Sequence, residues 1–131
     1  MKIAAAVALA MIVAARPFGA GATDWSTARK VRVVTVEYAF KPANLTFHQG
    51  VAYRLRVDNK GKETHEFTAP DFFKAVELRD AKPLNADHTE IVVQPGEHKD
   101  LYFVAKQAGS YKLICSDHDW AGMVGSITVS P

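Results

Sequence analysis

Residues 115–123 read Cys-Ser-Asp-His-Asp-Trp-Ala-Gly-Met and join two strand-like segments near the end of the chain. Cys115, His118 and Met123 therefore bring a thiolate, an imidazole and a thioether into one short loop. A thiolate combined with imidazoles selects copper or zinc, and a weak thioether ligand favours copper. A mononuclear copper site of this kind has three equatorial ligands, one thiolate and two imidazoles, with a distant methionine. The loop supplies only one imidazole, so a second histidine must come from elsewhere in the chain.

The sequence that flanks this loop alternates apolar and polar residues, which is the pattern of half-buried β-strands. Residues 51–57 show it most clearly, because every second side chain is Val, Tyr or Leu. Turn residues recur at intervals of about ten residues, as in β-sandwiches. We therefore expect an all-β sandwich of seven to eight strands, with a bulge at Val33-Val34 and one short helix near 71–78, capped by Asp71.

The first 22 of the 131 residues have the features of a secretory signal peptide. Lys2 is followed by an apolar run over residues 3–15, and Ala20-Gly21-Ala22 matches a cleavage site. An uncleaved anchor is the alternative, but the run is short for a membrane span. We expect a signal peptide at 1–22, a domain at 23–131, and export to the periplasm.

The charge of the mature chain argues against two classes of partner. Cleavage after Ala22 would remove Lys2 and Arg16, which leaves 14 basic and 14 acidic residues. A neutral chain has no general electrostatic basis for binding nucleic acid or an anionic membrane. We therefore expect neither as a partner.

The single cysteine, Cys115, excludes an intramolecular disulfide. A free thiol is unusual in an exported protein, and metal coordination would protect it from oxidation. Of the five histidines, His65 is best placed to complete the ligand set, because it follows a turn at the start of a strand. The others outside the loop adjoin turn residues and are interpreted as solvated: His48, His88 and His98.

At the end of an all-β exported chain, the spacing C-x2-H-x4-M resembles that of the cupredoxins, the small type 1 blue-copper proteins. The similarity covers roughly residues 31–129. Besides the loop and His65, the motifs that carry it are Phe40-Lys41-Pro42, Leu45-Thr46-Phe47 with Gly50, Pro95-Gly96-Glu97, Gly109-Ser110-Tyr111 and Gly122-Met123-Val124-Gly125.

The resemblance implies a Greek-key β-sandwich that holds one copper ion between His65, Cys115 and His118, with Met123 as a weak axial ligand. It also implies outer-sphere electron transfer that cycles Cu(II) and Cu(I). His118 would be the electron port, and Trp120 and Ala121 would form part of the surface that receives redox protein partners. We expect a monomer.

One residue departs from the family pattern. Many members carry Asn directly after the first histidine, where this chain has Glu66. A carboxylate beside copper would accept hydrogen bonds, lower the reduction potential or act as an alternative ligand. The other interpretation is that Glu66 points outward or pairs with a lysine such as Lys62.

Two other functions use similar residues. A periplasmic copper-binding, copper-delivery or copper-resistance protein would share the fold, although the mature chain lacks Met-rich or His-rich tails. An enzyme built on Cys115 and His118 would need an orienting group and an oxyanion site, and neither is evident. We therefore expect an electron carrier and not an enzyme.

Overall fold

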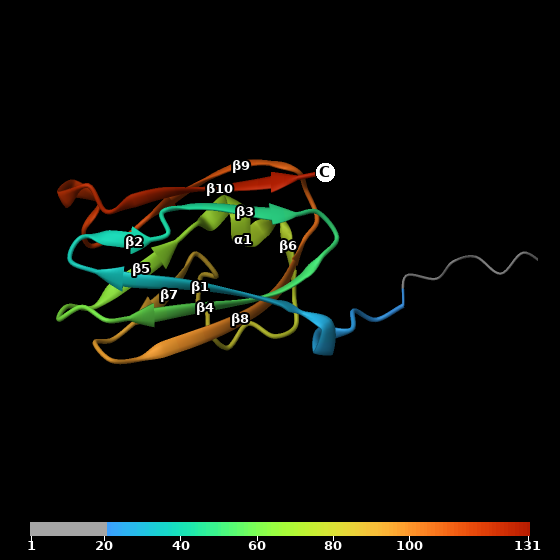
Figure 1. The fold of residues 1–131 in the computed structure, drawn as a ribbon, viewed down its shortest axis with the longest axis horizontal. Coiled ribbons are helices and arrows are strands. Elements are labelled where there is room, and N and C mark those ends of the chain that lie inside the picture. Colours follow the sequence, from blue (N-terminus) through green and yellow to red (C-terminus); the bar gives the residue numbers. More distant parts are fainter. Residues whose placement is uncertain (1–20) are drawn as a thin grey trace, which may run out of the picture.

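A computed structural model describes residues 21–131, so the predicted signal peptide lies outside the described residues except for Gly21 and Ala22. Within this part of the chain, ten β-strands form two five-stranded sheets that face each other (Figure 1). The all-β sandwich predicted from the sequence is confirmed. No helix between residues 21 and 131 combines the length and the apolar character needed to cross a membrane.

The first sheet has the order β2-β1-β4-β8-β6. Its strands are β1 (Arg29–Val36), β2 (Ala39–Lys41), β4 (Ala52–Asn59), β6 (Val76–Leu78) and β8 (His98–Ala105). Strand β1 runs parallel to β4, and the remaining pairs are antiparallel. A short 3-10 helix, η1 (Trp25–Thr27), precedes this sheet.

The second sheet has the order β3-β10-β9-β5-β7. Its strands are β3 (Asn44–His48), β5 (His65–Thr68), β7 (Glu90–Val93), β9 (Gly109–Ile114) and β10 (Val124–Ser130). Strand β10 is parallel to β3 and antiparallel to β9. Helix α1 (Pro70–Lys74) follows β5, and the 3-10 helix η2 (Asp119–Ala121) lies between β9 and β10.

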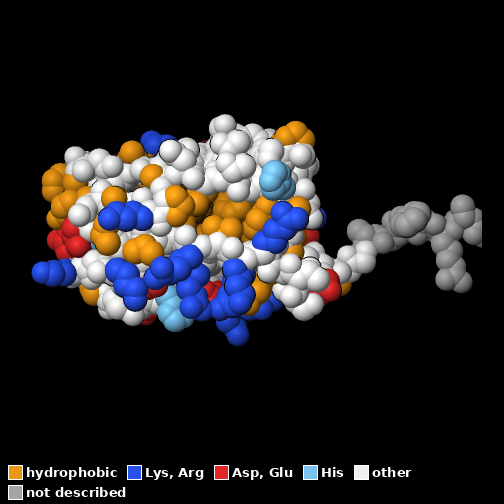
Figure 2. All heavy atoms as spheres, in the orientation of Figure 1, with side chains coloured by type: hydrophobic (Ala, Val, Ile, Leu, Met, Phe, Trp, Pro, Cys, Tyr) orange, Lys and Arg blue, Asp and Glu red, His pale blue; other side chains and the backbone are white. Residues whose placement is uncertain are grey.

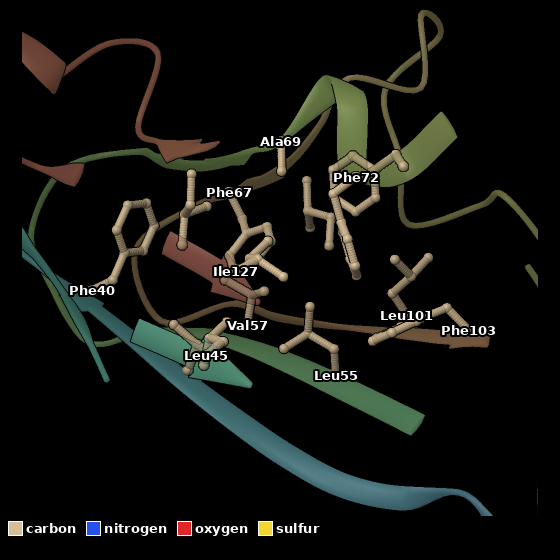
Figure 3. Close-up of a cluster of buried hydrophobic side chains, with 14 of the residues drawn as sticks. Phe40, Leu45, Leu55, Val57, Phe67, Ala69, Phe72, Leu101, Phe103 and Ile127 are labelled. Atoms are coloured by element: carbon tan, nitrogen blue, oxygen red, sulfur yellow. The ribbon is translucent and has the colours of Figure 1, made fainter. Parts of the chain in front are cut away.

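The core lies between the two sheets and is built from the alternating apolar residues of both (Figure 3). Aromatic rings fill its centre. The Phe47 ring stacks on Phe72, with centroids 5.8 Å apart, and meets Phe103 edge-on at 5.0 Å. Burying large aromatic side chains in these geometries stabilises the sandwich and holds its ends in place.

The first strand differs from the prediction. The pairing of β1 with β4 is continuous from Arg29 to Thr35, so the bulge predicted at Val33-Val34 is wrong. The inward residues are Val33 and Thr35, both fully buried, while Val34 is half-buried. A polar threonine occupies a core position, which made the apolar pattern look as if it changed phase.

The predicted helix is shorter than expected. Helix α1 ends at Lys74, and Val76 begins β6, which pairs with β8. Asp71 lies in the first turn and its side chain does not cap the helix. Strands β2 and β6 have three residues each, too few to show alternation, which explains why the structure has more strands than the seven or eight expected.

Charged residues line the outer face of the first sheet, where lysines and arginines gather over β1, β4 and β8 (Figure 2). Arg54 and Arg56 project from β4, and both donate hydrogen bonds to Asp100 on β8 at 2.8–3.3 Å. The hydrogen bond from Arg56 is the main reason that the pKa of Asp100 falls to about 2. The carboxylate thus stays ionised and offsets repulsion between the two guanidinium groups.

We predict that Asp100→Asn destabilises the protein at pH 6 and not at pH 2. The pKa of Asp100 is about 2 in the folded chain and near 3.9 in an unfolded one, so its stabilisation is present above pH 4 and lost as the pH falls toward 2. Urea unfolding should show a difference of about 1–2 kcal/mol at pH 6. Asp80→Asn, which breaks the exposed pair with Arg79, is the control. A difference that does not change with pH would contradict the prediction.

Candidate metal centre

Three connections meet at one end of the sandwich, on the left in Figure 1. They are the turn between β1 and β2, the loop between β4 and β5, and the loop between β9 and β10. The backbone pairing of Thr68 with Ile114 joins β5 to β9. Thr68 ends β5 and Ile114 ends β9, and the two strands are antiparallel, so the start of β5 at His65 runs alongside the residues that follow β9, beginning with Cys115.

The structure brings His65, Cys115 and His118 into one cluster, in which the ligand atoms lie within 4.8 Å of one another. The Cys115 Sγ lies 4.0 Å from His65 Nδ1 and 3.5 Å from His118 Nδ1. His65 and Cys115 are fully buried, and the His118 side chain is 12% exposed. Three soft or borderline donors thus converge at one point that is almost closed to solvent.

Backbone hydrogen bonds close the loop that carries Met123. The N–H of Cys115 donates to the Met123 carbonyl at 3.0 Å, and the N–H of Met123 donates to the His118 carbonyl at 3.3 Å. Gly122 ends η2 with φ at +83°, a conformation that favours glycine. The Met123 side chain is fully buried.

Glu66 points inward, so the outward interpretation is wrong. Its side chain is buried, its backbone N–H donates to Cys115 Sγ at 3.4 Å, and the thiol donates to Glu66 Oε2 at 3.1 Å. Burial, followed by the hydrogen bond with Asp117, raises the pKa of Glu66 to about 7. Burial is also the main cause that raises the pKa of the Cys115 thiol to about 12, and the Glu66 carboxylate adds to it. A bare thiolate is therefore disfavoured here without a cation.

The sequence did not identify three residues that border the cluster. Glu37 Oε1 lies 3.4 Å from His65 Nε2, and Glu63 Oε2 lies 3.5 Å from His118 Nε2. The Tyr38 ring packs on the His118 ring, with centroids 4.8 Å apart. No local pattern marks these residues, because their contacts depend on two turns that meet only in the folded chain.

The remaining histidines lie apart from the cluster. His48, His88 and His98 are exposed, and the His48 ring faces the hydroxyl of Ser130 at 3.0 Å. Two surface hollows also lie elsewhere: one of about 380 Å³ lined by residues of β1 and β4, and one of about 250 Å³ lined by Thr68, Pro70, Asp71, Lys112 and Ile114. Neither is lined by a member of the cluster.

The donor set fits copper, because one thiolate and two imidazoles are the equatorial ligands of blue-copper sites. The sequence profile of the Cupredoxin-like domain matches residues 2–129. A plastocyanin from Mercurialis perennis is 39% identical over 94 residues, which span 72% of this chain and 90% of that protein. The chain belongs to the cupredoxin-like family. Its cofactor is one copper ion.

Solved cupredoxin structures share the fold at lower sequence identity. Auracyanin from the photosynthetic bacterium Roseiflexus castenholzii superposes with a TM-score of 0.59 at 20% identity, over 80% of this chain and 99% of that one. Auracyanin B gives a TM-score of 0.60 at 22% identity, over 80% and 91% of the two chains. These similarities support the cupredoxin-like sandwich as the fold.

We predict that Glu66→Gln stabilises the metal-free protein at pH 8. The pKa of Glu66 is about 7 in the folded chain and near 4.3 in an unfolded one, so its contribution to stability is lost as the pH rises from 4 through 7. The advantage of the variant over the parent should grow by about 2–3 kcal/mol between pH 4 and pH 8. Urea unfolding in the presence of a chelator measures it, and a constant difference would contradict it.

Proposed function

We propose that the protein is a periplasmic electron carrier with a type 1 copper site. His65, Cys115 and His118 would hold the ion, and Met123 would be a weak axial ligand. The observation that carries the proposal is the buried cluster of one sulfur and two ring nitrogens within 4.8 Å. Copper bound there supplies one-electron chemistry, by cycling between Cu(II) and Cu(I) with outer-sphere transfer.

In this function, the folded chain keeps the metal-binding donor atoms in fixed positions. The Glu66 N–H fixes the sulfur, and the closed backbone of residues 115–123 fixes the orientation of His118. The core beneath excludes water from His65, Cys115 and Met123. Ligands that move little between two oxidation states keep the structural cost of each electron transfer low.

The surface beside His118 suits a redox protein partner. Tyr38, Trp120 and Val124 are the exposed large hydrophobic residues among residues 21–131, with exposures of 38%, 76% and 48%. The Tyr38 ring packs against those of both His118 and Trp120, with its centroid 4.8 and 6.0 Å from theirs. Ala121, half-buried in the same loop, adds to this apolar surface. His118 is the proposed ligand that reaches solvent, and an apolar patch beside it allows a partner protein to approach closely.

Export and electron carriage fit together. The signal-like residues 1–22 imply a periplasmic location, and the lone cysteine is buried at the proposed metal site. An oxidising compartment spares a thiol that is both buried and coordinated. We infer a monomer that exchanges electrons with other proteins and catalyses no reaction of its own.

Copper binding for delivery or resistance is the alternative, and one observation favours it. The Glu66 carboxylate lies 3.1 Å from Cys115 Sγ, so it offers an oxygen ligand. Coordination by Glu66 in place of Cys115 would give an ordinary Cu(II) site with weak visible absorption, because the thiolate-to-copper transition would be absent. Electron paramagnetic resonance separates the two functions, because a blue-copper site has narrow copper hyperfine splitting.

Replacing Cys115 with Ser tests the proposal directly. The mature parent protein loaded with Cu(II) should show an intense thiolate-to-copper absorption band, which the variant should lack because a hydroxyl is not a soft ligand. Visible absorption and electron paramagnetic resonance of both proteins provide the measurement. An unchanged spectrum in the variant would refute the ligand set.

Met123→Leu tests the axial ligand separately. Removing a weak thioether should keep copper bound and raise the reduction potential, because the thioether donates electron density that favours Cu(II). Cyclic voltammetry and a copper assay on the same sample give both quantities. Complete loss of copper would show that Met123 holds the ion as a strong ligand, contrary to the weak axial role.

A further inference from the structure

Both histidines of the cluster present the same edge inward. The Nδ1 atoms face the Cys115 sulfur at 4.0 and 3.5 Å, which leaves each Nε2 on the outer edge of its ring. Each outer edge meets a carboxylate: Glu37 at 3.4 Å from His65 and Glu63 at 3.5 Å from His118. The same arrangement thus occurs twice, with acidic residues from different connections.

The partner of the outer nitrogen determines what the inner nitrogen can do. A neutral imidazole carries its proton on one ring nitrogen and a lone pair on the other. A carboxylate beside Nε2 accepts a hydrogen bond from the Nε2–H, so it keeps the proton on that nitrogen and leaves the Nδ1 lone pair free for a metal. Metal-binding histidines in proteins are commonly oriented in this way by an outer carboxylate.

Glu37 is held in a fixed position by the loop that leads to His65. Its Oε1 accepts hydrogen bonds from the backbone N–H groups of Lys62 and Glu63, the latter at 2.7 Å. The buried amide of Asn59 organises the same loop by donating to the carbonyls of Glu63 and Val93 at 2.8 and 2.9 Å. The carboxylate therefore bridges the turn after β1 and the loop before β5.

Gly61 provides the space for this carboxylate. A Cβ atom on Gly61 would lie 2.6 Å from Glu37 Oε1 and 2.8 Å from Oε2. The atoms it would meet belong to the end of a flexible side chain, so a methyl group would displace the carboxylate and leave the backbone in place. The fit indicates a specific position for Glu37 beside an otherwise buried ring.

His65 Nε2 needs this neighbour. The atom is fully buried and has no hydrogen bond of ordinary geometry within residues 21–131, while the Glu37 carboxylate faces it. A buried N–H without an acceptor is unfavourable, so the nearby acceptor decides where the ring proton resides. Glu63 is 47% exposed, whereas the Glu37 side chain is 28% exposed, so solvent screens the Glu63 contact more.

We propose that Glu37 is a positioning residue for His65, which fixes the ring proton on Nε2 and adds a negative charge that favours Cu(II) over Cu(I). Glu63 acts on His118 in the same way and more weakly. The inference rests on the proposed copper function for its effect on the potential. Its effect on the ring proton belongs to the metal-free protein.

Four variants separate charge, hydrogen bonding and placement. Glu37→Gln removes the charge and keeps an oxygen acceptor, while Glu37→Ala removes both. Gly61→Ala keeps every charged group in the chain but displaces the Glu37 carboxylate from its position. Glu77→Gln, which removes a carboxylate of β6 that is paired with Lys106, is the matched control.

The metal-free protein gives the first readout. Long-range ¹H–¹⁵N spectra should show His65 with its proton on Nε2 in the parent, in Glu77→Gln and in Glu37→Gln. In Glu37→Ala and Gly61→Ala the ring should show a mixture of both tautomers. A His65 ring with the proton on Nδ1 in the parent, or one unchanged in both alanine variants, would overturn the proposal.

The copper-loaded protein gives the second readout. Loss of an outer carboxylate weakens metal binding by about tenfold at the low end of known cases. If Cu(II) alone is affected, a tenfold loss corresponds to a rise of about 59 mV in the reduction potential. The rise in reduction potential should be largest in Glu37→Ala, smaller in Glu37→Gln and smallest in Glu63→Gln. Glu77→Gln should show no rise. Equal potentials in all variants would overturn the electrostatic part.

The two readouts also distinguish the proposals from each other. If the parent protein gives no thiolate-to-copper band, the copper function fails, while the tautomer measurement still decides whether Glu37 positions His65. If the band is present and the tautomer does not respond to the alanine variants, the positioning role fails and the copper function stands.

Discussion

The structure depends on one constraint at the Cys115 sulfur. This atom must lose its proton to bind a metal, yet it lies in a part of the core that excludes water. Burial raises the pKa of the Cys115 thiol to about 12, so the folded chain does not favour a thiolate without a compensating cation. The two imidazoles, the Glu66 N–H and the closed loop surround that atom. The backbone pair between Thr68 and Ile114 makes their meeting possible.

Charge is unevenly distributed although the predicted mature chain is neutral. Glu37, Glu63 and Glu66 border the cluster, while arginines and lysines collect on the outer face of the first sheet (Figure 2). Net charge alone therefore conceals an acidic end and a basic side. A charged partner would sense this asymmetry at distances up to about a Debye length.

Much of the fold could be predicted because it follows from a period of two and from turn residues. The three clustered residues could also be singled out as candidate ligands, since two lie in one short loop and His65 begins a strand after a turn. The prediction of a bulge at Val33-Val34 is wrong because Thr35, a polar residue, occupies a core position. The alternation of apolar and polar residues along a strand indicates which face is buried only when the buried residues are apolar.

The outer carboxylates could not be predicted for a different reason. Glu37 lies in the turn after β1 and His65 begins β5, and nothing in either segment indicates that they meet. Glu66 departs from the family pattern in the sequence itself, but the direction of its side chain depends on how β5 packs beside β9. Ligands in one loop are a local property of the sequence, whereas the residues behind them are a property of the assembled fold.

The hydrogen bond from the Cys115 N–H to the Met123 carbonyl has an evolutionary consequence. It closes the ligand loop at its base, and directly beyond it Ile114 pairs with Val124 in the regular ladder between β9 and β10. Insertions or deletions between Cys115 and Met123 would therefore leave the register of the sheet unchanged. Natural selection can vary the length and composition of this loop as a separate unit while the strands on either side of it keep their pairing.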